Sequence, residues 1–328
     1  MRMPSRGDDA VGKGRPWLRL LLGLAVVAFF MWFLQGQWGE LRRLVAGLAP
    51  DWPLLALASC SIGAGYAVLV AAWRALIATF GSRLDLLDAV RIWFVSSLGK
   101  YVPFKLAAIG AMAVLARDAG TSAIAATGSA IVMQLVNIAA GFVVIAAIGA
   151  GDLGAQQPAL RAVAITMLVA TPLAILFGPA LLRGCVTTAS RLLRRELPMP
   201  DGVTRATLLW VTLANIGSWL CYGVGFWLFA QALLGRAPGS LASATAVWAA
   251  SYLAGFLALP APGGVGVREA VLTALLVSLR LASPADAALL AAASRVWLTV
   301  LEIVPGLGFI PGTIRRRSTT DLPDGPTP

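Results

Sequence analysis

The stretch "LPAPGGVGVREA" at residues 259–270 decides how this chain is organised. It combines two prolines and three glycines with the adjacent pair Arg268–Glu269, and long apolar runs lie on both sides of it. Proline and glycine interrupt helices, and charged side chains are unfavourable in an apolar environment. The stretch therefore predicts a helix that is interrupted at a place where the chain needs polar groups.

The composition around this stretch is that of a membrane protein. Of the 328 residues, 59% are hydrophobic and only 12% are charged, whereas soluble domains carry about 25% charged residues. Apolar runs recur along the chain, and each is long enough to cross about 30 Å of hydrocarbon. None of these runs alternates with a two-residue period, and a lipid environment requires every backbone group to be paired internally. The sequence therefore predicts an all-α polytopic membrane protein.

Several classes of function are excluded or disfavoured by the residue content. The chain contains no histidine, which excludes Ser-His-Asp and Cys-His catalysis and any histidine-ligated metal. The net charge is +11, but the basic residues lie at the ends of apolar runs, where they orient helices and contact anionic lipids. We therefore expect membrane lipids rather than nucleic acid as partners, with no metal or other cofactor.

The apolar runs divide the chain into membrane spans and terminal tails. We expect a basic tail at 1–16, a membrane domain at 17–312 and a disordered tail at 313–328. Six full transmembrane helices are expected at 17–35, 53–80, 121–150, 159–183, 205–234 and 284–311. Two further apolar regions, 86–117 and 242–281, contain helix breakers near their middles. These two regions are expected to be broken helical hairpins.

The distribution of Lys and Arg gives the orientation of the spans. Basic residues gather in the tail at 1–16, in the connection at 183–205 and at Arg315–Arg317, so these segments should share the cytoplasmic side. Counting crossings from that side, each interrupted region must end on the side where it begins. We therefore expect two re-entrant hairpins that enter the membrane from opposite faces, with both termini cytoplasmic.

The two interrupted regions also occupy matching places in an internal repeat. "AGTSAIAA" at 119–126 aligns with "LASPADAA" at 281–288, and the same register aligns the first break with the second. Inverted halves at about 17–150 and 159–312 would each hold three spans and one hairpin. Inverted repeats whose interrupted helices meet near the membrane midplane are typical of transporters, and the interruptions mark their binding sites.

The chemistry expected at the breaks is anion binding. At the first break, "SSLGKYVPFK", Gly99 ends one helix and Pro103 suits the start of the next. At the second, the turn is made by Pro262, Gly263 and Gly264, and a helix should restart near Val265. Helix N-termini expose unpaired N–H groups and about half a positive charge, which favours phosphate. We expect the two breaks to form a backbone anion site.

Ionisable residues near the breaks and in the last span complete the candidate site. Arg295 and Glu302 lie about two turns apart near the middle of that span, and a charge there costs roughly 2.5–3.5 kcal/mol, so such residues usually face a cavity or a partner. Snorkelling of Lys100 and a purely structural ion pair in the last span are open alternatives. The candidate substrate-binding residues are Lys100, Lys105, Arg268, Glu269, Arg295 and Glu302.

Other polar and aromatic residues are expected to be structural. Gln134 and Asn137 should make contacts between helices. Tryptophans near the ends of spans should form an interfacial belt, and these are Trp17, Trp32, Trp38, Trp52, Trp93 and Trp210.

Four stretches resemble the lysylphosphatidylglycerol synthase transmembrane (flippase-like) family over roughly residues 17–312. They are "LGKYVP", "ARDAGTSAIAATGSAIVMQL", "PAPGGVGVREAVLTALL" and "AAASRVWLTVLEIVPGLGF". The resemblance implies a bacterial or archaeal inner-membrane protein that moves a lipid with a polar headgroup between leaflets. It also implies a role for the Arg268–Glu269 pair. Related sequences tend to have Pro-Gly where this chain has Pro103-Phe104, so the first break is expected to differ in shape.

The expected function is that of a lipid flippase or translocator without chemistry of its own. The resemblance implies a headgroup such as aminoacylated phosphatidylglycerol or a polyprenyl-phosphate-linked sugar. It covers only the membrane part of the family, so we expect any synthase or glycosyltransferase partner to be a separate chain. Two alternatives stay open. One is an integral-membrane glycosyl or lipid transferase with Asp51 or Asp152 as catalytic carboxylate, and the other is a non-catalytic membrane partner of a glycosyltransferase.

Overall fold

The computed structural model describes residues 49–101, 106–149, 158–194, 202–258 and 262–320. The basic tail at 1–16 and the span expected at 17–35 lie outside these residues. The described part contains no strand; it contains nine α-helices and two short 3-10 helices. The long helices are α2 (Trp52–Ala78), α5 (Ala123–Gly149), α7 (Pro158–Leu193), α8 (Arg205–Leu234) and α11 (Pro284–Thr320).

These five helices correspond to five of the six expected spans. Each is long and apolar enough to cross a membrane, with α11 meeting that criterion over Pro284–Phe309. The prediction of an all-helical, polytopic membrane protein is therefore confirmed. α11 continues to Thr320, past the expected end of the membrane domain at residue 312. Its basic segment Arg315–Arg317 lies close to the helix C-terminus, where the helix dipole favours cations.

Side-chain caps fix where several helices begin. The Asp51 carboxylate accepts a hydrogen bond from the N–H of Leu54 at 3.0 Å at the start of α2. The Thr204 hydroxyl caps α8 in the same way, by accepting from the N–H of Thr207 at 3.1 Å. Such caps satisfy backbone donors that have no partner within the helix.

The two interrupted regions each form a pair of short helices. In the first, α3 (Leu86–Ser97) is followed by the 3-10 helix η1 (Leu98–Tyr101) and by α4 (Leu106–Asp118). In the second, α9 (Leu241–Leu257) is followed by η2 (Pro262–Gly264) and by α10 (Val267–Ser278). The two short helices of each pair pack against one another. The second helix restarts two residues later than expected, at Val267, and Pro103 lies outside the described residues.

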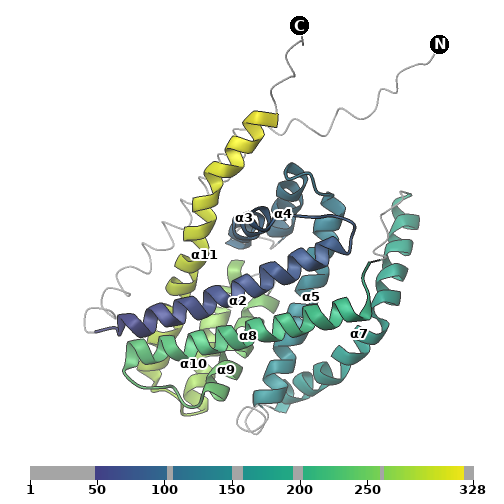
Figure 1. Cartoon of the computed structure of the whole chain (residues 1–328). Helices are drawn as coiled ribbons and strands as arrows, with labels where there is room; N and C mark the ends of the chain where they lie inside the picture. The colour runs from purple at the N-terminus through teal and green to yellow at the C-terminus, as the bar shows by residue number, and fades with distance from the viewer. Residues whose placement is uncertain (1–48, 102–105, 150–157, 195–201, 259–261, 321–328) are drawn as a thin grey trace, which may run out of the picture. The chain divides into compact units, whose positions relative to one another are not determined.

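Each interrupted region packs on the long helix that follows the other interrupted region in the sequence. Figure 1 shows α2 and α8 running side by side, and they form an extensive contact. The hairpin helix α9 packs on the span α5, and the hairpin helix α3 packs on the span α11. Each hairpin therefore contacts the long helix that follows the other hairpin. This exchange brings η1 and η2 together, with Cα atoms within 8 Å of each other.

Candidate functional site

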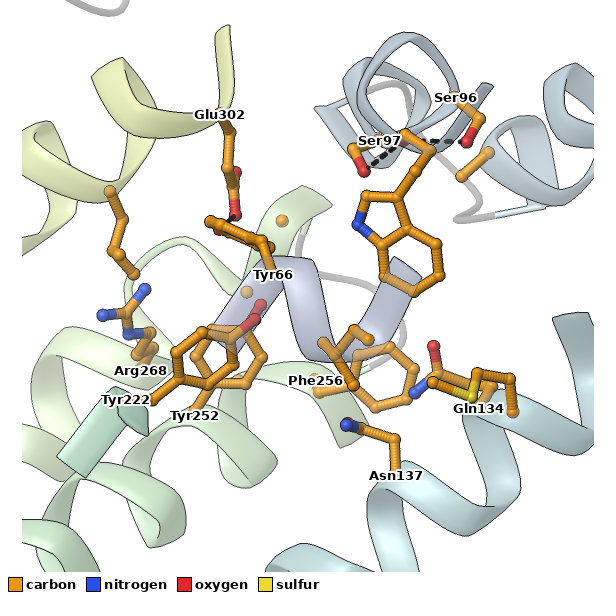
Figure 2. A pocket seen from close by; sticks show the side chains of 18 of the residues that line it. Tyr66, Ser96, Ser97, Gln134, Asn137, Tyr222, Tyr252, Phe256, Arg268 and Glu302 are labelled. Atoms are coloured by element: carbon orange, nitrogen blue, oxygen red, sulfur yellow. Dashed lines mark hydrogen bonds between the residues drawn. The ribbon is translucent and has the colours of Figure 1, made fainter. Parts of the chain in front are cut away.

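A cavity of about 320 Å³ lies where the two interrupted regions meet. Gly263 and Gly264 of η2 line it, and Ser96 and Ser97 line it from the end of α3, just before η1. The rest of the wall is supplied by α2, α4, α5, α8, α9, α10 and α11. Figure 2 shows the labelled side chains around the cavity. Both broken helices therefore contribute to one chamber.

Glycine is required at the second break by its backbone geometry. Gly263, Gly264 and Gly266 all have positive φ angles, of 56°, 70° and 82°. Residues with a Cβ rarely adopt this left-handed region. A Cβ on Gly264 would also lie 2.6 Å from the carbonyl oxygen of Gly255 in α9. The "PGGVG" sequence thus lets bare backbone turn sharply while it lies against a neighbouring helix.

The turn is held by an ion pair between Glu269 and Arg295. Arg295 Nη1 in α11 donates to the carbonyl oxygen of Gly263 at 2.9 Å and to Glu269 Oε1 at 3.2 Å. The other oxygen of Glu269 accepts from the N–H of Gly266 at 2.8 Å, at the start of α10. The Glu269 carboxylate therefore connects the start of α10 to α11 at the second break.

Arg268 lies in a different environment from its neighbour. It is only 6% exposed, and its guanidinium carbon lies 4.4 Å from the ring centre of Trp248 and 5.1 Å from that of Tyr252. Its Nη2 atom is buried and has no hydrogen-bond partner among the described residues. Stacking on aromatic rings contributes about 0.5–2 kcal/mol, whereas an unmade bond from a buried polar group costs about 1–3 kcal/mol. Arg268 lines the cavity, so an anion there could complete its hydrogen bonding.

Glu302 and Arg295 both line the cavity from α11. Glu302 is 4% exposed and Arg295 is 8% exposed. The hydroxyl of Tyr66 in α2 donates to Glu302 Oε1 at 2.5 Å. Tyr66 and Glu302 thus join α2 to α11. Arg295 separately joins α11 to η2 through Gly263 and to α10 through Glu269.

Amide side chains line the cavity away from Arg268. Gln134 and Asn137 of α5 lie on the opposite side of the view from Arg268 in Figure 2. Asn137 Nδ2 donates to Asn215 Oδ1 in α8 at 2.9 Å, and the indole N–H of Trp219 donates to the carbonyl oxygen of Asn137 at 3.0 Å. The expected role of Asn137 in helix–helix contact is confirmed, and its side chain also reaches the cavity.

Aromatic residues of the wall were missed by the sequence analysis. Trp93, which is expected in an interfacial belt, lines the cavity from α3. Tyr66, Tyr222 and Tyr252 also line the cavity, although the chain has only four tyrosines. Their concentration in the middles of apolar helices was a signal that could have been used, since a tyrosine hydroxyl seeks a polar partner when buried.

The predicted residues of the first break lie at the edge of the described residues or outside them. Lys105 and Pro103 lie outside the described residues, and for Lys100 only the backbone, in η1, is described. Gly99 is also in η1. Within the described ranges, no group of three or more His, Cys, Asp or Glu side chains is arranged to hold a metal ion.

Comparison with known proteins bears on the identity of this fold. Neither a search of curated proteins nor a search of solved structures finds a match. The family model for the lysylphosphatidylglycerol synthase transmembrane region matches residues 20–306. This range includes both interrupted helices and all the described residues that line the cavity. The chain therefore belongs to the lysylphosphatidylglycerol synthase transmembrane region family.

Proposed function

We propose that the chain is a flippase or translocator that moves a lipid with a polar, phosphate-bearing headgroup between leaflets. The headgroup would pass through the cavity between the two breaks while the acyl or prenyl chains stay in lipid. The observation that carries this proposal is the buried guanidinium of Arg268, which lines the cavity and has an N–H without a partner among the described residues. A phosphate oxygen would accept that bond and balance the charge.

The proposal includes an inverted repeat of two re-entrant hairpins. Each hairpin packs on the long helix that follows the other one, and Cα atoms of η1 and η2 lie within 8 Å of each other. These are the contacts expected of two halves related by a pseudo-two-fold axis in the membrane plane. A sixth span at 17–35 would give both termini a cytoplasmic location in a bacterial or archaeal inner membrane.

We further propose that the chain performs no chemistry itself and acts beside separate lipid-modifying enzymes. The Asp51 carboxylate, a candidate in the transferase alternative, is engaged as the cap of α2. Asp152, the other candidate, lies outside the described residues. Glu302 lies in the cavity but accepts a hydrogen bond from Tyr66. This use of the carboxylates favours transport over transfer.

The test is lipid exchange in liposomes that contain the purified protein. An acyl-labelled fluorescent phosphatidylglycerol is quenched with dithionite, so that only outer-leaflet label is lost unless the protein exchanges leaflets. Arg268→Met should reduce the exchange rate at least tenfold while leaving the thermal midpoint unchanged or higher, because replacing a buried charge without a partner by an apolar side chain often stabilises. The matched control is Arg236→Met, which removes an arginine exposed to 52% and paired with Asp286.

Three results would contradict the proposal. Exchange no faster than in protein-free liposomes with several anionic lipids would remove transport as the function. Equal exchange by Arg268→Met and Arg236→Met would remove the cavity as the route. Transfer of a sugar or aminoacyl group by the purified chain, lost on substitution of Asp51 or Asp152, would establish the transferase alternative.

A further inference from the structure

We infer that the cavity selects lipids whose phosphate carries a neutral polyhydroxyl group, such as a glycerol, an inositol or a single sugar, over lipids whose headgroup carries an amine. This inference rests on the proposed function, because it names the substrate class of the same cavity. It is carried by the kinds of polar group on the two sides of the chamber and by the engagement of its carboxylates.

The first step is the supply of carboxylates, which a cationic headgroup would need. Among the described residues of the lining, the charged side chains are Arg268, Arg295 and Glu302. Glu302 is held by the Tyr66 hydroxyl and makes a further interaction. Glu269 is not part of the lining, and both of its oxygens accept bonds, from Gly266 and Arg295. An ammonium group entering the cavity would therefore lose water without gaining a carboxylate that is ready to bind it.

The second step is the balance of charge at the cavity surface. Among the lining residues that the structure describes, two guanidinium groups and one carboxylate sum to a formal charge of +1. Arg295 is paired with Glu269 and Glu302 is held by the Tyr66 hydroxyl. Arg268, whose buried Nη2 has no hydrogen-bond partner among the described residues, is therefore the guanidinium placed to bind an anion. A phosphodiester supplies one negative charge and pairs with it. A lysyl ester on the same phosphate would add two ammonium groups beside guanidinium groups, and like charges placed together are strongly unfavourable.

The third step is the chemistry on the side away from Arg268. Gln134 and Asn137 present amides and Phe256 presents an aromatic ring on this side. Trp93 also lines the chamber. One N–H of Asn137 is used by Asn215, and an amide has a second N–H and a carbonyl oxygen for further bonds. Amides that both donate and accept match hydroxyl groups, which also do both. Flat aromatic faces suit the apolar C–H faces of a ring or polyol.

The fourth step is size. The cavity of about 320 Å³ is at the lower end of the range of about 300–1,000 Å³ found for small-molecule pockets. It suits a phosphate with one small neutral group and is too small for a long oligosaccharide. The expected headgroup is therefore compact, anionic and hydroxylated.

The experiment measures binding and exchange for three lipids with matched chains: phosphatidylglycerol, phosphatidylinositol and lysyl-phosphatidylglycerol. Binding to the full chain in micelles is measured by thermal stabilisation with short-chain lipids, and exchange is measured in liposomes with acyl-labelled lipids. We expect phosphatidylglycerol and phosphatidylinositol to bind at least tenfold more tightly than lysyl-phosphatidylglycerol, which corresponds to about 1.4 kcal/mol. Exchange rates should follow the same order.

A charge substitution tests the cause of the preference. Gln134→Glu places a carboxylate on the cavity wall and should raise the affinity for lysyl-phosphatidylglycerol while lowering that for phosphatidylglycerol. Gln231→Glu makes the same change in α8, where the side chain donates to the carbonyl oxygen of Trp227 and does not belong to the lining. It should leave the ratio of the two affinities unchanged.

The failure of this inference can be told from the failure of the proposed function. Equal or tighter binding of lysyl-phosphatidylglycerol by the unaltered chain would overturn the inference, even if every lipid were exchanged. A binding preference for the hydroxylated lipids without any exchange would support the inference and overturn the flippase proposal. A Gln134→Glu variant with an unchanged preference would overturn the assignment of selectivity to this cavity.

Discussion

Replacing Gly264 by alanine tests whether the second break has the backbone geometry described above. Gly264 has a φ of +70°, and its added Cβ would lie 2.6 Å from the carbonyl oxygen of Gly255. A left-handed conformation costs about 1–2 kcal/mol for a residue with a Cβ, and overpacking costs about 1–3 kcal/mol. Gly264→Ala should therefore destabilise the protein by roughly 2–5 kcal/mol.

Two other glycines separate the contributions to this loss. Gly266 has a φ of +82°, and a Cβ there would meet no atom within 4 Å, so Gly266→Ala should lose only about 1–2 kcal/mol of backbone strain. Gly63 lies inside α2, and its Cβ would also have no neighbour within 4 Å. Gly63→Ala should be neutral or stabilise by about 0.5–1 kcal/mol, because alanine is favoured over glycine within helices.

The assay is the thermal midpoint of each purified variant in detergent micelles, together with its lipid-exchange rate in liposomes. The midpoint should fall from Gly63→Ala to Gly266→Ala to Gly264→Ala, and exchange should be slowest for Gly264→Ala. If Gly264→Ala unfolded at the same temperature as Gly63→Ala and exchanged lipid normally, the tight left-handed turn against α9 would not be part of the folded protein.

The remaining predictions concern the ion pairs and the helix contacts, and each is read from the thermal midpoint. Arg295→Met should lower the free energy of unfolding by roughly 1–3 kcal/mol. This is less than the loss expected on breaking a fully buried ion pair, because the Glu269 side chain is 24% exposed. Glu269→Gln should cost less than Arg295→Met, since the amide oxygen can still accept from the backbone at the start of α10; the opposite order would contradict the assigned bonds. Gly225→Ala should destabilise by about 1–3 kcal/mol, because its Cβ would lie 2.8 Å from Ile62 of α2, whereas Gly217→Ala in the same helix has open space and should be neutral or better. Arg236→Ala removes a pair whose side chains are 52% and 31% exposed, and should change the free energy of unfolding by at most about 1 kcal/mol.

Much of the fold could be predicted because the signals are local. Apolar runs long enough to span a membrane gave the positions of α2, α5, α7, α8 and α11, to within a few residues at most ends apart from the extended C-terminal ends of α7 and α11. Proline and glycine gave the interruptions, since both act on the backbone of their own residue. For this reason the predicted position of the second break is close to the observed one. A helix is expected to restart near Val265, and α10 begins at Val267.

The partners of the charged residues could not be predicted in the same way. Arg268 and Glu269 are adjacent in sequence, but successive residues on a helix point in different directions, so one stacks on Trp248 and the other reaches Arg295. Choosing between these partners requires the packing of α9, α10 and α11, which no local pattern specifies. Tyrosines within apolar helices are a local signal, but their meeting at one cavity depends on the packing of α2, α8 and α9.

If a lipid headgroup occupies the chamber between the two breaks, a photoreactive group on that headgroup should crosslink to residues of the chamber wall. An anionic lipid with a photoreactive group on its headgroup would be activated in liposomes that contain the protein, and the labelled residues would be identified by mass spectrometry. We expect adducts on Tyr252 and Phe256 of α9 and on Gln134 of α5, and we expect fewer of them in Arg268→Met. Adducts confined to the exposed apolar face of α7, at equal levels in the variant, would contradict this placement of the headgroup.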